Sequence, residues 1–393
     1  STPTAKIDVA QPAPARRPAD APGPHARTTM STSDLVAGAA VKAASPEAAE
    51  VVLKKEAAEA YPETKSLDLN PLHWWEAISY HWKAGNMNYP MGIYISLCHY
   101  WAVIGLFRVT SCMLPTLLWA YILWPITGLG ITAGVHRLWS HRSYEAGKVV
   151  RCTLMLFNSI ANQGSIYHWA RDHRVHHKHS ETDADPHNAT RGFFFAHMGW
   201  LYVKKHPDIM VEGKKLDFSD LSRDGFVMFQ KHLDPWFTLF MCFVFPALVA
   251  KFGWGEDFWN AFWVAGALRY IVVLHCTWLV NSAAHFFGDH PYDDQWPAEN
   301  PFVSLASIGE GWHNWHHKYP YDYAASEFGI GSQFNPTKLF IDGAAALGLV
   351  WNRKRATSAW ERSKVKRDAG GVEKTAVQRR AEQKRGAAAE KEE

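Results

Sequence analysis

The chain has 393 residues, of which 47% are apolar, and its formal net charge at pH 7 is only +3. Its five cysteines are scattered without a Cys-x-x-Cys pair, which argues against a disulfide framework and against a thiolate metal site. The 19 Trp and 14 Tyr are typical of a membrane protein with aromatic belts at the lipid–water interface. Because the mean hydropathy is slightly negative, apolar spans must alternate with long polar segments.

The N-terminal segment, residues 1–70, is rich in Ala, Pro, Glu and Lys and contains few aromatic residues. Such a composition cannot bury enough apolar surface to fold, so we expect a disordered tail. It contains no apolar core followed by a cleavage site, and no secretory signal peptide is expected. From Pro71 the sequence predicts a short amphipathic helix with Trp75, Ile78 and Trp82 on one side, typical of a helix in the headgroup zone.

Four apolar stretches follow, and each approaches the ~20 apolar residues that a bilayer requires. The predicted spans cover residues 91–109, 113–135, 235–250 and 258–280. His99 lies in the first span and His275 in the fourth, and an ionisable residue inside the membrane is a functional candidate by default. Neither has a second histidine near it in the sequence, so we expect packed, neutral roles for both.

Three histidines stand in the order His-x-x-His-His within WARDHRVHHKHSETDADPHN, which begins at Trp169. Residues three and four apart share one face of a helix, so these imidazoles can converge on one point. The same spacing recurs in GWHNWHH, two more histidines bracket HRLWSH, and another ends TWLVNSAAH. The nine candidates are His136, His141, His173, His176, His177, His285, His313, His316 and His317.

Neutral imidazole is the commonest metal ligand in proteins. A solvated polar helix that happens to be rich in histidine explains one such cluster but not its repetition at identical spacing. The two copies therefore predict two metal ions, each held mainly by nitrogen. The ligands alone allow zinc as well as iron, because imidazole suits both metals.

Lysine and arginine are frequent in residues 136–230 and in the C-terminal tail, whereas the short turns between spans carry little beyond Arg108 and Lys251. The positive-inside rule therefore places both termini and all nine histidines in the cytosol. We predict an all-α membrane protein with four transmembrane helices and a cytosolic helical cap that holds a histidine-rich dimetal site. This domain is expected to cover residues 71–350, with a charged tail over 351–393.

The motifs HRLWSH, HRVHH and HNWHH, together with NSAAH, are similar to the histidine boxes of membrane fatty acid desaturases. The stretches WARDHRVHHKHSETDADPHN, GEGWHNWHHKYPYDYAASEFG and TWLVNSAAH resemble the stearoyl-CoA (acyl-CoA Δ9) desaturases of animals, and the likeness runs from about Pro71 to Leu349. His313 stands where front-end desaturases carry Gln, which argues against that branch. Gly164 and His168 depart from the family's pattern, which has Asn and an acid near these places, so a polar contact to the coenzyme is expected to be missing.

The resemblance implies an oxidoreductase that uses O2 to insert a cis double bond at Δ9 into a saturated fatty acyl-CoA. It implies two iron ions held by the nine histidines, with Asn281 holding a water, in a multi-pass protein of the endoplasmic reticulum membrane. Electrons would come from cytochrome b5 and its reductase. The sequence has no strand–GxGxxG–helix unit and no further histidine pair for a fused haem domain, consistent with a separate donor. Membrane lipid is an expected partner, and nucleic acid is not.

Acyl-CoA carries phosphates on its coenzyme and an apolar chain that points toward the membrane. The resemblance implies phosphate contacts from basic residues, a hydrogen bond from the coenzyme to an aspartate, and aromatic walls along the acyl path. The expected substrate contacts are Trp169, Arg171, Asp172, Lys204, Lys205, Trp278 and Trp124. For Lys204 and Lys205 a solvated basic face is an equal alternative.

Trp124 is predicted to close the acyl channel, because it stands 12 positions before His136, or ~18 Å along a helix. A bulky residue at that depth would favour palmitoyl over stearoyl chains. The alternative is that Trp124 faces lipid.

Two other functions fit parts of the pattern. A related di-iron hydroxylase acting on lipid or alkane would use the same histidine boxes. A histidine-rich metal transporter or sensor belongs to a different class, and should place several polar ligands within its spans at helical spacing. The spans offer only His99 and His275, which favours the enzyme.

Overall fold

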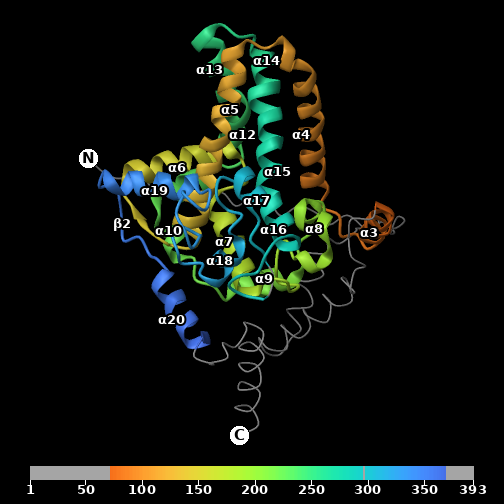
Figure 1. Ribbon diagram of the computed structural model, residues 1–393. Helices are drawn as coiled ribbons and strands as arrows, with labels where there is room; N and C mark the ends of the chain where they lie inside the picture. The colour runs from red at the N-terminus through yellow and green to blue at the C-terminus, as the bar shows by residue number, and fades with distance from the viewer. Residues whose placement is uncertain (1–70, 295–296, 369–393) are drawn as a thin grey trace, which may run out of the picture. The chain divides into compact units, whose positions relative to one another are not determined.

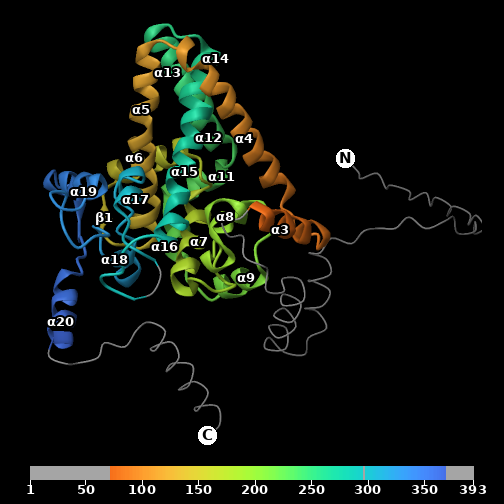
Figure 2. The same ribbon diagram turned by 45° about the vertical axis from the view of Figure 1, so that its right-hand side comes forward.

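The computed structural model describes residues 71–294 and 297–368. The expected disordered tail over residues 1–70 and the charged residues 369–393 lie outside the described residues. Four helices of the described chain are long and apolar enough to cross a membrane, and they rise side by side from a base of shorter helices (Figures 1 and 2). The four candidate spans are Tyr89–Ser111, Leu114–Ser140, Trp236–Trp254 and Phe258–Phe286.

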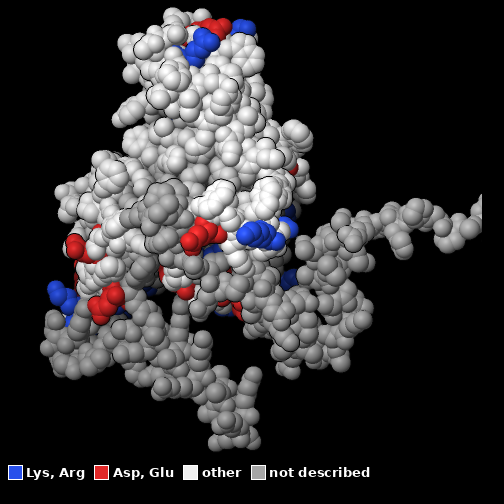
Figure 3. Space-filling model, turned by 90° about the vertical axis from the view of Figure 1, so that its right-hand side faces the viewer, with Lys and Arg blue, Asp and Glu red and all other residues white. Residues whose placement is uncertain are grey.

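Helical structure is what these apolar sequences require in lipid, where every backbone N–H and C=O must find its partner within the chain. Local signals set the helix starts: Asn88 caps the first span, and prolines stand at the first turns of the first two. Figure 3 shows a broad band of the helices without charged residues on the face in view. The spans are built from α4 (Tyr89–Arg108) and η1 (Val109–Ser111); α5 (Leu114–Leu129) and η2 (Gly130–Ser140); α12 (Trp236–Leu239), η5 (Phe240–Val244) and α13 (Phe245–Trp254); and α14 (Phe258–Ala261), η6 (Phe262–Leu268), α15 (Arg269–Asn281) and α16 (Ala283–Phe286).

The second and fourth spans continue beyond the ends expected from the sequence. The second was expected to end at residue 135, but η2 carries the helix on to Ser140 as a wider π-helical segment. After a break at Ser282, α16 extends the fourth span to Phe286. As a consequence, His136 and His285 stand on the span helices themselves, at the ends nearest the cap.

The cap encloses the largest hydrophobic core of the described residues, in which η2 packs against α6, α7 and α19, and α11 packs against α6 and α7. Two short antiparallel strands close one side, with Glu145 opposite Trp351. The cap elements are β1 (Glu145–Ala146), α6 (Lys148–Ala161), α7 (Ile166–His179), η3 (Ala189–Arg191), α8 (Phe193–His197), η4 (Gly199–Leu201), α9 (Pro207–Lys214), α10 (Ser219–Arg223), α11 (Gly225–Leu233), α17 (Pro301–Ala306), α18 (His313–Lys318), α19 (Pro336–Ala346), β2 (Val350–Trp351) and α20 (Thr357–Asp368).

The amphipathic helix predicted from Pro71 is present as α3 (Pro71–Lys83). Trp75 and Trp82 expose 73% and 62% of their surface, while Ala77 on the opposite side is buried. The apolar exposed face is what a helix in the headgroup zone needs. That location stays a prediction.

The packed structure extends beyond the boundary expected at residue 350. Arg355 donates a 2.8 Å hydrogen bond to the buried carboxylate of Asp322, and Trp360 packs on Tyr292 and Trp315. The sequence after residue 350 predicts a tail because it is rich in charged residues and lacks a hydrophobic pattern, which the single packed aromatic residue Trp360 does not create. Residues 351–365 therefore belong with the domain.

Candidate metal centre

All nine candidate histidines lie together at the junction of the spans and the cap. Their ligand nitrogens form two groups, and within each group the nitrogens lie within 4.8 Å of one another. The first histidine group is His136, His141, His173, His177 and His316. The second histidine group is His176, His285, His313 and His317.

The two His-x-x-His-His segments are shared between the groups. On α7, His173 and His177 belong to the first group and His176 to the second. On α18 the division is reversed. His316 belongs to the first group, whereas His313 and His317 belong to the second. The pairs that share a group are four apart and thus lie on one helix face, whereas the odd histidine points to the neighbouring group.

The geometry fits metal ions. Nε2 of His136 lies 2.9 Å from Nε2 of His316, and Nε2 of His141 lies 2.8 Å from Nε2 of His173. Separations near 3 Å suit neighbouring ligands of one ion, because metal–nitrogen bonds are ~2.0–2.1 Å long. Nε2 of His285 is buried and has no hydrogen-bond partner among the described residues. A cation would use these lone pairs.

The electrostatics point the same way. Burial holds the pKa of six of these histidines well below the ordinary value, and neighbouring imidazoles lower it further. The six are His141, His173, His177, His313, His316 and His317. They are therefore neutral near pH 7, which is the form that binds metal.

Three carboxylates, which the sequence reasoning missed, stand behind the rings. Each lies within 3 Å of Nδ1 of one histidine, as an ion-pair contact for Glu310 and as a hydrogen bond for Asp185 and Glu181, so that Nε2 faces the group. The pairs are Glu310 with His136 (2.9 Å), Asp185 with His176 (2.9 Å), and Glu181 with His285 (2.8 Å). Glu181 and Asp185 lie within the stretch that begins at Trp169, but the sequence does not say which ring each carboxylate reaches.

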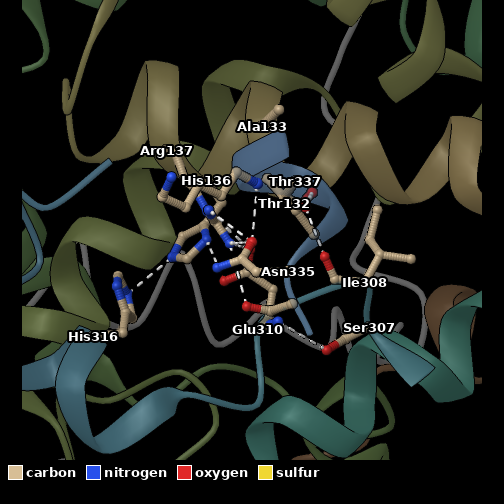
Figure 4. A network of polar contacts seen from close by, with 12 residues as sticks. Thr132, Ala133, His136, Arg137, Ser307, Ile308, Glu310, His316, Asn335 and Thr337 are labelled. Carbon is tan, nitrogen blue, oxygen red and sulfur yellow. Dashed lines mark hydrogen bonds and ion pairs between the residues drawn. The ribbon is translucent and has the colours of Figure 1, made fainter. Parts of the chain in front are cut away.

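Glu310 and Asp185 are both ionised. Burial would raise the pKa of Glu310, but Arg137 and His136 outweigh it and hold that pKa at about 2. Arg137 donates to Glu310 over 2.7 Å and to the carbonyl of Ala324 over 2.9 Å, and Figure 4 shows this network beside His136. For Asp185, the charges of His176 and His187 outweigh burial and hold the pKa at about 2. The carboxylates thus present full negative charge to the ligand rings.

A cavity of ≈ 550 Å³ adjoins both groups and leads toward the spans. Four of the nine histidines line it, together with apolar side chains such as Ile95, Ile131 and Leu274. Five residues expected at the substrate or metal site also line it, namely Trp169, Asp172, Lys205, Trp278 and Asn281. Trp169 stacks on the ring of His173, with 4.8 Å between ring centroids. The cavity therefore brings the expected apolar path to the metal centre.

Three expected substrate residues do not line this cavity. Arg171 lies just behind it and donates to Asp172 over 2.9 Å, while Lys205 forms an ion pair with the same carboxylate. Lys204 is exposed, and its backbone N–H donates to the carbonyl of Asn86. The basic cluster at the cavity is therefore centred on Asp172.

Trp124 lies on α5 seven residues before Ile131, which lines the cavity. Seven residues are two turns, or ~10 Å, so the two side chains share a face of the helix. The indole N–H of Trp124 donates to the carbonyl of Ala306 over 3.2 Å. Trp124 is thus fixed beyond this cavity and not in its wall, and its closing role stays a prediction.

The two positions that depart from the family's pattern both line the cavity. Gly164 has a φ of +86°, a backbone conformation that favours glycine, and no atom lies within 4 Å of where a Cβ would be. Nδ1 of His168 lies 3.2 Å from the hydroxyl of Ser165. Neither residue offers a carboxylate to a ligand.

The expectation that His99 and His275 are isolated is wrong. Nε2 of His99 lies 3.2 Å from Nε2 of His275, because α4 and α15 bring them together across 176 positions of sequence. Nδ1 of His275 in turn lies 2.9 Å from Nε2 of His197 on α8. We call these residues the three-histidine chain; they belong to neither histidine group.

The arrangement defines a membrane-spanning helical protein with a histidine-lined dimetal site, and sequence comparison gives its family. The sequence model of the fatty acid desaturase family matches residues 112–324, more than half of the chain. The chain therefore belongs to the fatty acid desaturase family.

Its similarity to individual members extends over most of their length. It is 54% identical over 264 residues to stearoyl-CoA desaturase 5 of Bos taurus, which covers 67% of this chain and 78% of that protein. It is 51% identical over 284 residues to acyl-CoA desaturase 3 of Mus musculus, covering 72% and 79%. With stearoyl-CoA desaturase of Homo sapiens the identity is 51% over 280 residues, covering 71% and 77%.

Proposed function

We propose that this protein is an acyl-CoA desaturase that inserts a cis double bond, at Δ9, into a saturated fatty acyl-CoA. The observation that carries the proposal is the cavity, which places apolar walls beside two groups of converging histidines, six of which burial keeps neutral. Relatives named as stearoyl-CoA and acyl-CoA desaturases, about half identical to this chain, support the same activity.

The reaction converts CH2–CH2, O2, two electrons and two protons into CH=CH and two waters. Breaking an unactivated C–H bond requires oxygen activation, which two iron ions bound by the histidines would supply. The protein's part is to hold the ligands and to exclude water. The proposed ligands are the five and four histidines of the two groups, with Asn281 acting through a water. The carboxylates behind the rings keep their Nε2 atoms directed inward.

The acyl chain would lie along the apolar wall of the cavity, between Trp169 and Trp278. Trp169 lines the path of the acyl chain and also stacks on His173, so it can fix the methylene groups of the acyl chain relative to the metal centre. The coenzyme would lie at Arg171, Asp172 and Lys205, where positive charge can meet phosphate. Lys204, which is exposed and precedes Lys205 directly, adds positive charge there.

Electrons would come from cytochrome b5 and its reductase, because no dinucleotide or haem motif is found in the sequence. An acidic donor is steered by the lysines and arginines of the cap. We also propose that the protein resides in the endoplasmic reticulum membrane with its cap and both termini in the cytosol. The charge distribution of the sequence supports that orientation.

Expression in cells that lack their own Δ9 desaturase, followed by fatty acid profiling, tests the proposal. We expect Δ9 monounsaturated products. A hydroxylated product would instead identify the related hydroxylase. With the purified, iron-loaded protein, NADH alone should give no turnover, whereas adding cytochrome b5 and its reductase should restore it. Turnover with NADH and no added protein would contradict the proposed electron donor.

A further inference from the structure

The three-histidine chain ends on groups of fixed hydrogen-bonding character. At one end, Nδ1 of His99 lies 2.8 Å from the carbonyl of Ile95, and a carbonyl can only accept. At the other end, Nδ1 of His197 lies 2.9 Å from the hydroxyl of Ser282, which lies 2.9 Å from the carbonyl of Trp278. The three-histidine chain therefore runs between two backbone carbonyls, those of Ile95 and Trp278.

These ends determine the protons of the neutral chain. His99 must donate from Nδ1 to Ile95, so its Nε2 accepts from His275. His275 then donates from Nε2 to His99 and accepts at Nδ1 from Nε2 of His197. Nδ1 of His197 in turn accepts from the hydroxyl of Ser282. Two ring–ring contacts, one contact to the hydroxyl and two to carbonyls make five, but three neutral imidazoles and one hydroxyl supply only four protons.

One added proton removes this deficit. With it, Ser282 donates to the carbonyl of Trp278, and every ring–ring contact still contains one proton. A second added proton would place a proton on both sides of one of these contacts, so that two donors would face each other without an acceptor. The three-histidine chain can thus accept a single proton without losing a hydrogen bond.

The indole of Trp278 is packed among all three rings. It stacks on His99 at 6.3 Å between ring centroids, and it meets His275 at 5.1 Å and His197 at 5.7 Å. A positive charge on His275 or His197 lies within the ~6 Å range of a cation–π interaction with the indole. Trp278 is also a wall of the cavity, so the chain touches the proposed acyl path through this one side chain.

Among the described residues, no charged side chain outside the three-histidine chain shifts the pKa of His197. Burial, and then the charges of His275 and His99, lower the pKa of His197 to about 4, while the carbonyl of Trp278 acts in the opposite direction. No carboxylate, lysine or arginine is among the groups that shift it. Of the helices packed there, α4 presents His99, α15 presents His275, and α8 presents Phe193, which stacks on His197. Proton uptake is therefore confined to the acid side of histidine's ordinary range.

We propose that His99, His275 and His197 bind one proton behind Trp278 and thereby make acyl binding and proton binding oppose each other. The inference rests on the acyl role of the cavity given under Proposed function. An alkyl chain in the cavity removes water from beside Trp278, and a positive charge behind the indole then loses solvation. Linkage makes the effect reciprocal, so acidification weakens acyl binding by the factor by which acyl binding weakens proton uptake.

The test compares three iron-loaded proteins, namely the wild type, His275→Gln and His232→Gln. The amide of glutamine can still hydrogen-bond to both neighbours of position 275 but cannot take up a proton. His232 is an exposed histidine of α11 and serves as the matched control. Calorimetric titration with saturated acyl-CoA, in buffers of different ionisation heat, gives both the affinity and the protons released. At acid pH we expect wild type and His232→Gln to release more protons than His275→Gln, and to lose about fivefold more affinity relative to neutral pH.

Equal proton release by His275→Gln and the wild type would overturn the inference. If His275→Gln does not fold, His197→Gln is held to the same criterion. The 3′-phosphate of the coenzyme titrates in every protein alike and cancels in the comparison. Trp278→Ala separates the two proposals, because unchanged acyl-CoA affinity in this variant would reject the acyl role of the cavity. Weakened affinity there, with equal release by His275→Gln, would reject only the proton site.

Discussion

The metal centre and the three-histidine chain use the same side chain in two arrangements. In the metal centre, rings face one another through Nε2, and three of them present Nδ1 to a carboxylate. In the three-histidine chain, His275 contacts its two neighbours through both ring nitrogens. The outer nitrogens of His99 and His197 contact a carbonyl and a hydroxyl. Converging lone pairs backed by negative charge suit a cation, whereas a line of rings without carboxylates suits shared protons.

The largest expected effect follows from removing a converging nitrogen. His176→Ala or His316→Ala should abolish desaturation and lower the iron content, because each removes one ligand from its group. The measurements are turnover with the reconstituted donor and iron per protein. His232→Ala, at an exposed position, should keep both. Near-normal turnover with full iron in either ligand variant would reject the dimetal assignment.

The next effect concerns the groups behind the rings. Asp185→Asn keeps the shape but removes the charge beside His176, and we expect a ~10–100-fold loss in metal affinity or activity. Ser282→Ala removes the hydroxyl at the end of the three-histidine chain and should leave the iron content unchanged. Iron content after competition with a chelator measures the difference. Equal iron loss in both variants would show that the two arrangements are not distinct.

These contrasts also mark what the sequence could reveal. Helical spacing was enough to single out the six histidines of the two His-x-x-His-His segments, because positions three and four apart share a face over one turn. His136, His141 and His285 came from the motifs HRLWSH and TWLVNSAAH. The spacing could not show that His176 and His316 each leave their own triplet to join the other group, since that depends on how α7 and α18 face each other. His99 and His275 are 176 positions apart, and only the packing of α4 on α15 makes them partners.

The same limit applies to charges and boundaries. Glu310 stands three residues before His313, yet it serves His136, which comes 174 positions earlier in the chain. The apolar spans were predictable from composition, because lipid imposes helices on apolar stretches of that length. The packing of Trp360 was not, because a single aromatic residue among charged ones carries no periodic signal.

A third prediction compares the two tryptophans of the cavity wall. Trp169 stacks on His173 of the metal centre, whereas Trp278 packs on the three-histidine chain. Trp169→Ala should therefore lower kcat and raise the KM for acyl-CoA, while Trp278→Ala should chiefly raise KM. Steady-state kinetics at matched iron content decide the matter. Identical changes of kcat in the two variants would mean that Trp169 has no special relation to the reacting carbons.

The smallest expected effect lies farthest from both histidine arrangements. If the acyl channel continues along the face of α5 that carries Ile131, its end meets Trp124 two turns further on. Trp124→Ala would then open space for a longer chain, although the loss of its hydrogen bond to Ala306 also loosens α17. Trp124→Phe, which loses the same hydrogen bond but keeps a large ring, is the matched control.

We expect Trp124→Ala to move the products from 16 toward 18 carbons, and Trp124→Phe to move them less. One methylene of fit is worth only ~1–3 kcal/mol, so the shift should be graded, and iron content should stay unchanged. An unaltered 16-to-18-carbon product ratio in Trp124→Ala would confine the acyl chain to the cavity beside the metal centre. Chain length would then be set by the apolar side chains that line it, among them Ile95 and Leu274.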